Sequence, residues 1–182
     1  MARRWEPMLE QLVDERYPRL VARAMLLVPS RHDAEDLVQD ALVSTFGGRA
    51  RFRSIGEAEQ YVRLAITSRF VDRTRRGARE ADALTRVAGL PDQVVDEPTL
   101  SGLPGELKSA LARLSPRQRA CVMLRHLDDL SVRETAALLG LSEGAVKRYA
   151  SDGVAVLNAL LGTTSVVAEP VRLVPTEVRR DA

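Results

Sequence analysis

The side chains best suited to specific chemistry lie between Ser142 and Ser151, where Glu143, Lys147 and Arg148 follow at short spacing. They combine a carboxylate, two cations and hydroxyls, which are groups that proteins use to read base edges and hold phosphates. On a helix that enters the major groove, the first two turns meet the bases while flanking cations meet the backbone. An ordinary helical hairpin with a solvated, charged face would show the same residues, so the rest of the chain has to decide.

Two short helices joined by a tight turn are predicted over Leu130–Leu157, LSVRETAALLGLSEGAVKRYASDGVAVL. Ser131 with Glu134 three residues later is a capping box, which begins the first helix. Gly140 ends that helix because glycine readily adopts the left-handed conformation found just past a helix end, and Ser142 caps the second helix. Apolar residues repeat at helical spacing in both helices: Val132, Ala136 and Leu139, then Val146, Ala150 and Val154. The segment is therefore a predicted helix-turn-helix.

A stripe of three carboxylates lies on the helix predicted over residues 31–46, RHDAEDLVQDALVSTF. Asp33, Asp36 and Asp40 follow at i, i+3 and i+7 and share one face, while the apolar residues form another. Like charges at this spacing repel each other by roughly 0.2–0.5 kcal/mol per pair, a cost that favours a basic partner surface. A solvated acidic face is the alternative.

A basic surface is predicted on the helix over residues 57–76, whose polar side carries arginines with small hydroxyls between them. This pattern is typical of a surface that follows a phosphate backbone, and an amphipathic helix charged only for solubility is the alternative. In the preceding loop, Arg51 and Arg53 flank Phe52. Phe52 could stack on a base of a single strand or anchor the loop in the core, and the sequence leaves both possibilities open.

Composition excludes several classes of protein. Cys121 is the single cysteine of 182 residues, so the sequence has no disulfide framework and no cysteine-based metal site. His32 and His126 are the only histidines, no Glu-x-x-His pair occurs and no glycine-rich phosphate loop is present, so we expect no enzyme, no metal and no cofactor. No apolar run approaches the roughly 18 residues of a membrane span, and no signal-peptide core follows the N-terminal arginines. We therefore expect a cytoplasmic protein.

The expected fold is all-α, with two small helical domains joined by a flexible acidic linker. The first domain takes residues 1–80, where Pro18 either kinks the first helix or begins a second one. Prolines, glycines and acidic residues mark 81–105 as the linker. Residues 106–162 form a four-helix domain that contains the helix-turn-helix, and 163–182 form a tail whose role stays open.

Three segments occur in an order that resembles a known family. DAEDLVQDAL, then YVRLAITSRFVDRTRR, then LSPRQRACVMLRHLDDLSVRETAALLGLSEGAVKRYAS are similar to bacterial RNA polymerase sigma factors of the extracytoplasmic-function (ECF) group, in the form of the actinobacterial SigE-like subgroup. The resemblance covers roughly residues 8–80 and 105–161. It implies a transcription initiation factor that binds core RNA polymerase and promoter DNA, with an anti-sigma factor as a possible further partner.

The resemblance also implies which residues do the work. Contacts to the clamp helices of the largest polymerase subunit would come from Asp33, Asp36, Leu37, Gln39 and Asp40. The minus-ten element would be melted and held by Arg51, Phe52, Arg53, Arg63, Thr67, Ser68, Arg69, Arg73 and Arg76. The minus-thirty-five element would be read by Arg133, Ser142, Glu143, Ala145, Lys147, Arg148 and Ser151.

Three positions depart from the family pattern. Tyr61 stands where the family usually has tryptophan, and Ser68 where it often has asparagine. Asp152 replaces an arginine found in many relatives and would repel a nearby phosphate. A stand-alone helix-turn-helix regulator is the alternative function, but it would leave the acidic stripe and the basic helix unexplained.

Overall fold

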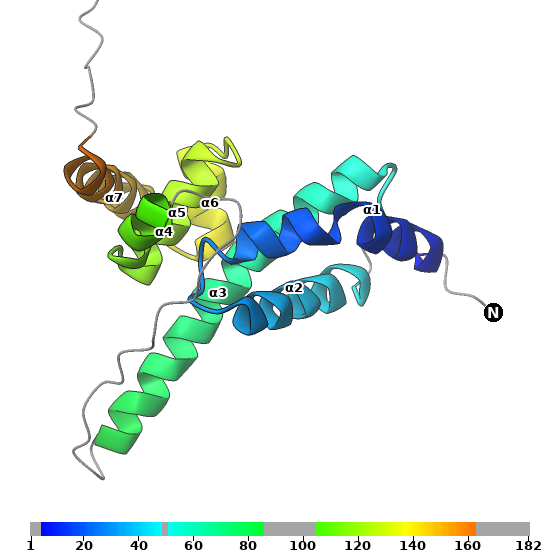
Figure 1. The fold of residues 1–182 in the computed structure, drawn as a ribbon, viewed down its shortest axis with the longest axis horizontal. Helices are drawn as coiled ribbons and strands as arrows, with labels where there is room; N and C mark the ends of the chain where they lie inside the picture. The colour runs from blue at the N-terminus through cyan, green and yellow to red at the C-terminus, as the bar shows by residue number, and fades with distance from the viewer. Residues whose placement is uncertain (1–4, 49–50, 86–104, 163–182) are drawn as a thin grey trace, which may run out of the picture.

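The computed structural model describes residues 5–48, 51–85 and 105–162, and within these ranges the chain forms seven α-helices and no strand (Figure 1). The N-terminal domain consists of α1 (Glu6–Ala24), α2 (Arg31–Phe46) and α3 (Ile55–Thr85). The C-terminal domain consists of α4 (Gly105–Ala112), α5 (Pro116–His126), α6 (Val132–Leu139) and α7 (Glu143–Leu161). The all-α prediction, with a four-helix second domain, is confirmed.

Helix α3 is longer than the sequence pattern predicted, and α1 is continuous through the proline that the sequence left open as a kink or as the start of a second helix. Pro18 lies inside α1 and no new helix begins there. Helix α3 continues to Thr85, past the predicted domain boundary at residue 80, because residues 77–85, GAREADALT, include three alanines and no proline. The remaining linker residues, 86–104, and the tail 163–182 lie outside the described residues.

Serine side chains cap five of the helices. The capping boxes at Ser115 and Ser131 are both formed, and Ser30, Ser54 and Ser142 accept a backbone N–H bond from the residue three positions on. Gly140, at φ 60°, takes the left-handed conformation that turns the chain from α6 into α7. The local signals read from the sequence therefore set the helix-turn-helix.

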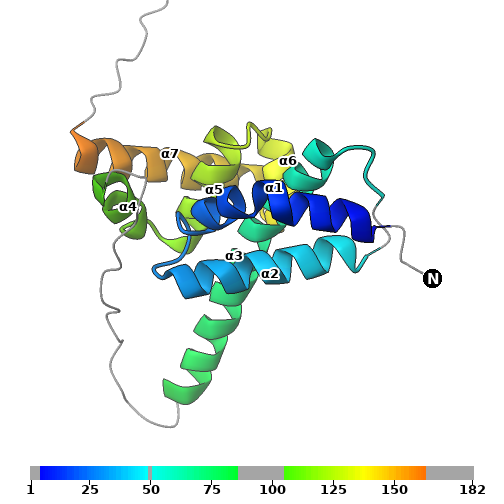
Figure 2. The ribbon, with the colours of Figure 1, turned by 45° about the vertical axis from the view of Figure 1, so that its right-hand side comes forward.

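One large apolar cluster runs through both domains, and a smaller one lies in the C-terminal domain. Leu20 and Ile66 of the N-terminal domain and Met123 and Val146 of the C-terminal domain are buried in the same cluster. Helix α3 packs on α1 and α2 along one side and on α5 and α6 along another (Figures 1 and 2). The two domains are therefore not separate bodies on a tether in this structure but share an interface along α3.

Candidate nucleic-acid interface

Helix α7 presents its first two turns to solvent. The Ser142 hydroxyl accepts a hydrogen bond from the Ala145 backbone N–H at 3.2 Å, which fixes the N-terminus of the helix. Of the predicted minus-thirty-five residues, Ala145 is half-buried. The others are exposed: Arg133, Ser142, Glu143, Lys147, Arg148 and Ser151. The opposite face of α7 is anchored by Val146, Ala150 and Gly153, which are buried. The helix is thus held from behind while its charged side stays open.

Two aromatic contacts orient the cations beside this surface. The Arg148 guanidinium lies 5.2 Å from the centre of the Tyr149 ring, and Arg117 donates a hydrogen bond to the Tyr149 hydroxyl at 3.3 Å. This bond, with a second from Arg148, lowers the pKa of Tyr149. Asp152 is exposed on the same helix, next to Ser151.

The basic side of α3 is only partly open. Arg69 and Arg76 are exposed, and the end of α3 that carries Arg76 extends beyond the other helices (Figures 1 and 2). Arg73 forms an ion pair with Asp40 of α2 at 2.6 Å, and Arg63 pairs with Asp128 of the C-terminal domain at 2.8 Å. Two of the predicted DNA-contacting arginines are therefore engaged within the chain.

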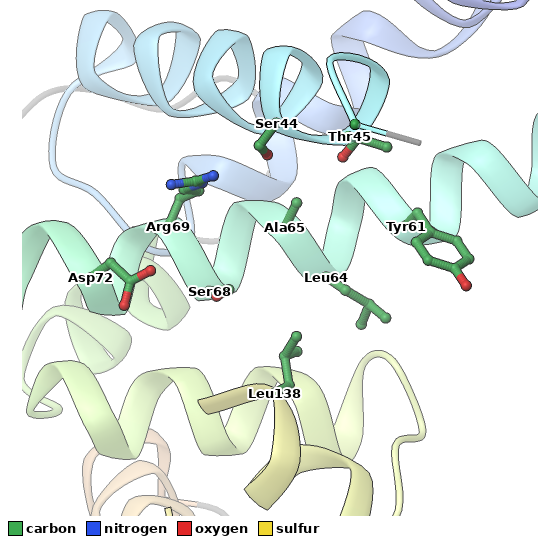
Figure 3. Close-up of a pocket in the computed structure, with 10 residues that line it drawn as sticks. Ser44, Thr45, Tyr61, Leu64, Ala65, Ser68, Arg69, Asp72 and Leu138 are labelled. Atoms are coloured by element: carbon green, nitrogen blue, oxygen red, sulfur yellow. The ribbon is translucent and has the colours of Figure 1, made fainter. Parts of the chain in front are cut away.

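A pocket of about 500 Å³ lies between α2, α3 and α6 on this side of α3 (Figure 3). Ser68 and Arg69 line it together with Tyr61 and Leu64, and Leu138 of α6 points toward it from the opposite wall. Thr67 is fully buried, and its hydroxyl donates to the Arg63 carbonyl at 3.4 Å, so it has no access to DNA in this arrangement.

The loop before α3 packs Phe52, which is half-buried, against the core. Its ring lies 5.3 Å from the Phe46 ring and 5.3 Å from the Tyr61 ring, and Phe46 in turn packs on Trp5. Of the two possibilities that the sequence left open, the contacts favour a core anchor. Arg51 and Arg53 on either side remain exposed.

Each carboxylate of the acidic stripe on α2 has a partner within the chain. Asp33 accepts from the Ser30 hydroxyl at 2.5 Å, Asp36 lies 3.7 Å from His32, and Asp40 pairs with Arg73. The repulsion inferred from the sequence is therefore relieved in part without a partner protein.

Leu37 was predicted to contact polymerase from the surface of α2, and its position in the structure corrects that prediction. It is fully buried in the core, so it supports α2 from beneath, whereas Gln39 is exposed. No cluster of three metal-ligating side chains occurs among the described residues.

Comparison with known proteins decides the family. Residues 12–80 match sigma-70 region 2, and residues 105–157 match sigma-70 region 4. The RNA polymerase sigma-E factor of Streptomyces avermitilis is 38% identical over 141 residues, which are 76% of each chain. The chain belongs to the SigE-like ECF sigma factors.

Two further relatives agree with this assignment. The ECF RNA polymerase sigma factor SigM of Mycobacterium tuberculosis is 30% identical over 154 residues, covering 84% of this sigma factor and 76% of that one. The sigma factor RpoE of Bartonella quintana, crystallised in complex with the anti-sigma factor NepR, matches with a TM-score of 0.60 at 25% identity, over 85% of this chain and 96% of that chain.

Family membership establishes what this sigma factor does. It is a transcription initiation factor that binds core RNA polymerase and directs it to promoters, and its region 2 domain disfavours the stand-alone helix-turn-helix regulator. Within the described ranges, no helix combines the length and apolar character needed to cross a membrane.

One buried charge cluster of this sigma factor was missed by sequence reasoning. Asp128, in the loop between α5 and α6, pairs with both Arg23 of α1 and Arg63 of α3. The partners are 105 and 65 residues away, so no local periodicity marks them. The sequence carries only a weak sign of this cluster, which is that Arg23 lies among the apolar residues on its face of the helix.

Proposed function

We propose that three surfaces of this sigma factor divide the work of initiation. The exposed acidic side of α2 docks on a basic surface of core polymerase, the basic side of α3 melts and holds the minus-ten element, and the first two turns of α7 read the minus-thirty-five element. In this division residues 1–80 act as the region 2-like unit, 81–105 as the linker, 106–162 as the region 4-like unit and 163–182 as a tail.

The geometry of α7 is the observation that carries the proposal. Its N-terminus is capped, its apolar side is buried against α5, and Glu143, Lys147 and Arg148 face solvent within two turns of the cap. A helix presented in this way fits the major groove, where an arginine can bond to guanine and a carboxylate can accept from the cytosine amino group.

The α3 surface supports a less specific role. Arg69 and Arg76 are exposed cations about two turns apart on α3, and the end of this helix extends from the body of the protein, which suits phosphate contacts along a strand. Ser68 offers one short hydroxyl where relatives often have an amide, so it makes fewer hydrogen bonds to a base. We expect a relaxed preference at the base that this side chain meets.

The remaining parts of the proposal concern setting and partners. The chain acts without catalysis of its own and without a cofactor, in the cytoplasm where its polymerase works, as expected from its sigma-factor relatives. A relative was crystallised with an anti-sigma factor, and we propose that a protein of that class can also hold this chain.

Transcription with purified core polymerase tests the proposal. Start sites are first mapped with the wild-type chain, and Arg69→Ala with Arg76→Ala is then compared with a control that replaces two exposed arginines elsewhere, Arg19 and Arg113. The α3 variant should slow opening of a duplex promoter, and a template already melted over the minus-ten element should restore part of the rate because strand separation is bypassed. Opening of duplex promoters at the control's rate would remove α3 from the melting step.

A further inference from the structure

A tyrosine hydroxyl on α7 binds two arginine side chains beside the proposed minus-thirty-five surface. Arg117 of α5 donates to the Tyr149 hydroxyl at 3.3 Å. The Arg148 guanidinium lies 5.2 Å from the centre of the Tyr149 ring and also bonds to the hydroxyl. Neither Arg117 nor Tyr149 belongs to the predicted DNA-binding residues, so the function proposed for α7 leaves this cluster unexplained.

The C-terminal domain holds both partners of the bond between α5 and α7 in place. The Tyr149 ring is half-buried and packs on the apolar core. Arg117 lies in the first turn of α5, where the Ser115 N–H donates to the Gln118 side chain at 3.0 Å and the Ser115 hydroxyl accepts from the Gln118 N–H at 3.4 Å. The same turn lies close against α7, because a Cβ atom added at Gly153 would be 3.5 Å from Gln118. The bond from Arg117 to Tyr149 is therefore formed in the absence of DNA.

The Tyr149 hydroxyl has its proton directed toward a further acceptor. A phenol accepts hydrogen bonds through its oxygen and donates one through its proton. Because the two arginines donate to the oxygen, the proton points toward a different group. The bond from Arg117, and after it the bond from Arg148, lower the pKa of Tyr149, which makes the hydroxyl a stronger donor. Arg117 and Tyr149 thus present N–H and O–H donors and a positive charge, the groups with which proteins hold a phosphate oxygen.

The position of this pair around α7 also suits a phosphate. A helix in the major groove has a phosphate backbone on each side. Lys147 and Tyr149 are two positions apart and therefore lie on nearly opposite sides of the helix. Lys147 supplies a cation on one side, whereas the side of Tyr149 carries the exposed carboxylate of Asp152 three residues on. The cation on this second side comes from Arg117, which is exposed at the start of α5.

We propose that Arg117 and Tyr149 form a phosphate site that holds the DNA backbone on one side of α7, opposite the backbone that Lys147 meets. The proposal rests on the proposed function of α7 as the reader of the minus-thirty-five element. Arg117 supplies the charge and Tyr149 a hydrogen-bond donor, and the Tyr149 ring keeps Arg148 beside the groove between the two backbones. Asp152 opposes the site, because its carboxylate repels the same phosphate.

The two members of the phosphate site should fail in different ways when they are replaced. Arg117→Ala removes a charge, so it should weaken binding to all promoter sequences and lower the salt slope by about one. Tyr149→Phe keeps the ring and its contact with Arg148 but removes the donor. It should weaken binding about tenfold, while the salt slope stays that of the wild type.

Matched controls make the same chemical changes outside the C-terminal domain. Arg19→Ala on α1 removes an exposed arginine, and Tyr17→Phe on α1 removes a hydroxyl from a half-buried ring. Both controls should bind the promoter as the wild type does.

Neutral phosphates test the site directly. The assay uses holoenzyme, the complex of this sigma factor with core polymerase, on a promoter fragment mapped for the wild-type chain. Each phosphate of the minus-thirty-five element is replaced in turn by an uncharged methylphosphonate. One replacement should weaken wild-type binding about tenfold and have little effect on Arg117→Ala and Tyr149→Phe, because the contact is already lost.

A purely structural bond between α5 and α7 gives a different result. Its loss would lower affinity without changing which phosphates matter. Equal losses at every phosphate for Arg117→Ala, Tyr149→Phe and the wild type would therefore overturn the phosphate site.

The base-readout variants separate this proposal from the function on which it rests. If Glu143→Ala changes the preferred bases while Arg117→Ala and Tyr149→Phe bind as their controls do, α7 reads the element and the phosphate site is refuted. If Glu143→Ala and Arg148→Ala keep the wild-type base profile and no phosphate responds to Arg117→Ala, the assignment of α7 fails and the phosphate site falls with it.

Discussion

Two glycines of α7 provide a matched pair of substitutions that probes how this helix is held. A Cβ atom added at Gly153 would lie 2.7 Å from the Val122 side chain and 3.5 Å from Gln118 of α5, whereas one added at Gly144 meets nothing within 4 Å. Val122 is buried and β-branched, so its methyl group has little freedom to move away. The same chemical change is thus a clash at one position and open space at the other.

The magnitude follows from two opposing contributions. Replacing glycine by alanine in a helix interior gains about 1 kcal/mol, while overpacking a core costs about 1–3 kcal/mol. Gly153→Ala should therefore lower the free energy of unfolding by up to about 2 kcal/mol, whereas Gly144→Ala, in the first turn, should raise it by at most about 1 kcal/mol. At about 2–4 °C per kcal/mol for a chain of this size, the two melting temperatures should differ by several degrees.

Urea unfolding followed by circular dichroism is the assay, and the unfolding slope should be unchanged in both variants. The reasoning would be refuted if Gly153→Ala were as stable as Gly144→Ala. That result would mean that α7 does not pack on α5 as closely as the distance to Val122 requires.

Two further predictions concern charge. Replacing Asp33, Asp36 and Asp40 together by alanine should weaken binding to core polymerase in a pull-down titration, while Asp14→Ala on α1 should not. Single changes should have little effect because an exposed ion pair contributes only about 0.2–1 kcal/mol. Wild-type affinity of a folded triple variant would show that α2 does not dock on polymerase. Asp152→Arg should tighten binding to a minus-thirty-five duplex and steepen its salt dependence by about one charge, because it exchanges a repelling group for one that meets a phosphate; an unchanged salt slope would place Asp152 away from the backbone.

The helical elements were predictable where the sequence carries a local stop or start. The Ser131–Glu134 capping box and Gly140 fix α6 and its turn by themselves. The end of α3 was not found because a falling apolar periodicity was interpreted as linker, although alanine-containing sequence without proline can continue a helix.

The candidate site was likewise predictable only where local spacing determines which side chains are exposed. The exposed residues at the start of α7 follow from helical spacing, since the apolar face identifies the side that is buried. The burial of Thr67, the pairing of Arg63 and the packing of Phe52 depend on contacts between distant segments. A single sequence does not encode such contacts in any local pattern, and the pairing of Asp128 with Arg23 and Arg63 is the clearest example.

Base readout by α7 is the central claim, and one measurement tests it most directly. A promoter library randomised at the minus-thirty-five element is transcribed by core polymerase with wild-type chain, Glu143→Ala, Arg148→Ala or Lys147→Ala, at two salt concentrations. We predict that Glu143→Ala and Arg148→Ala each change the preferred bases, with a discrimination of about 1–3 kcal/mol lost at one position, while Lys147→Ala lowers transcription evenly and more so at higher salt. If the base profiles of Glu143→Ala and Arg148→Ala both match the wild type, α7 does not read the element.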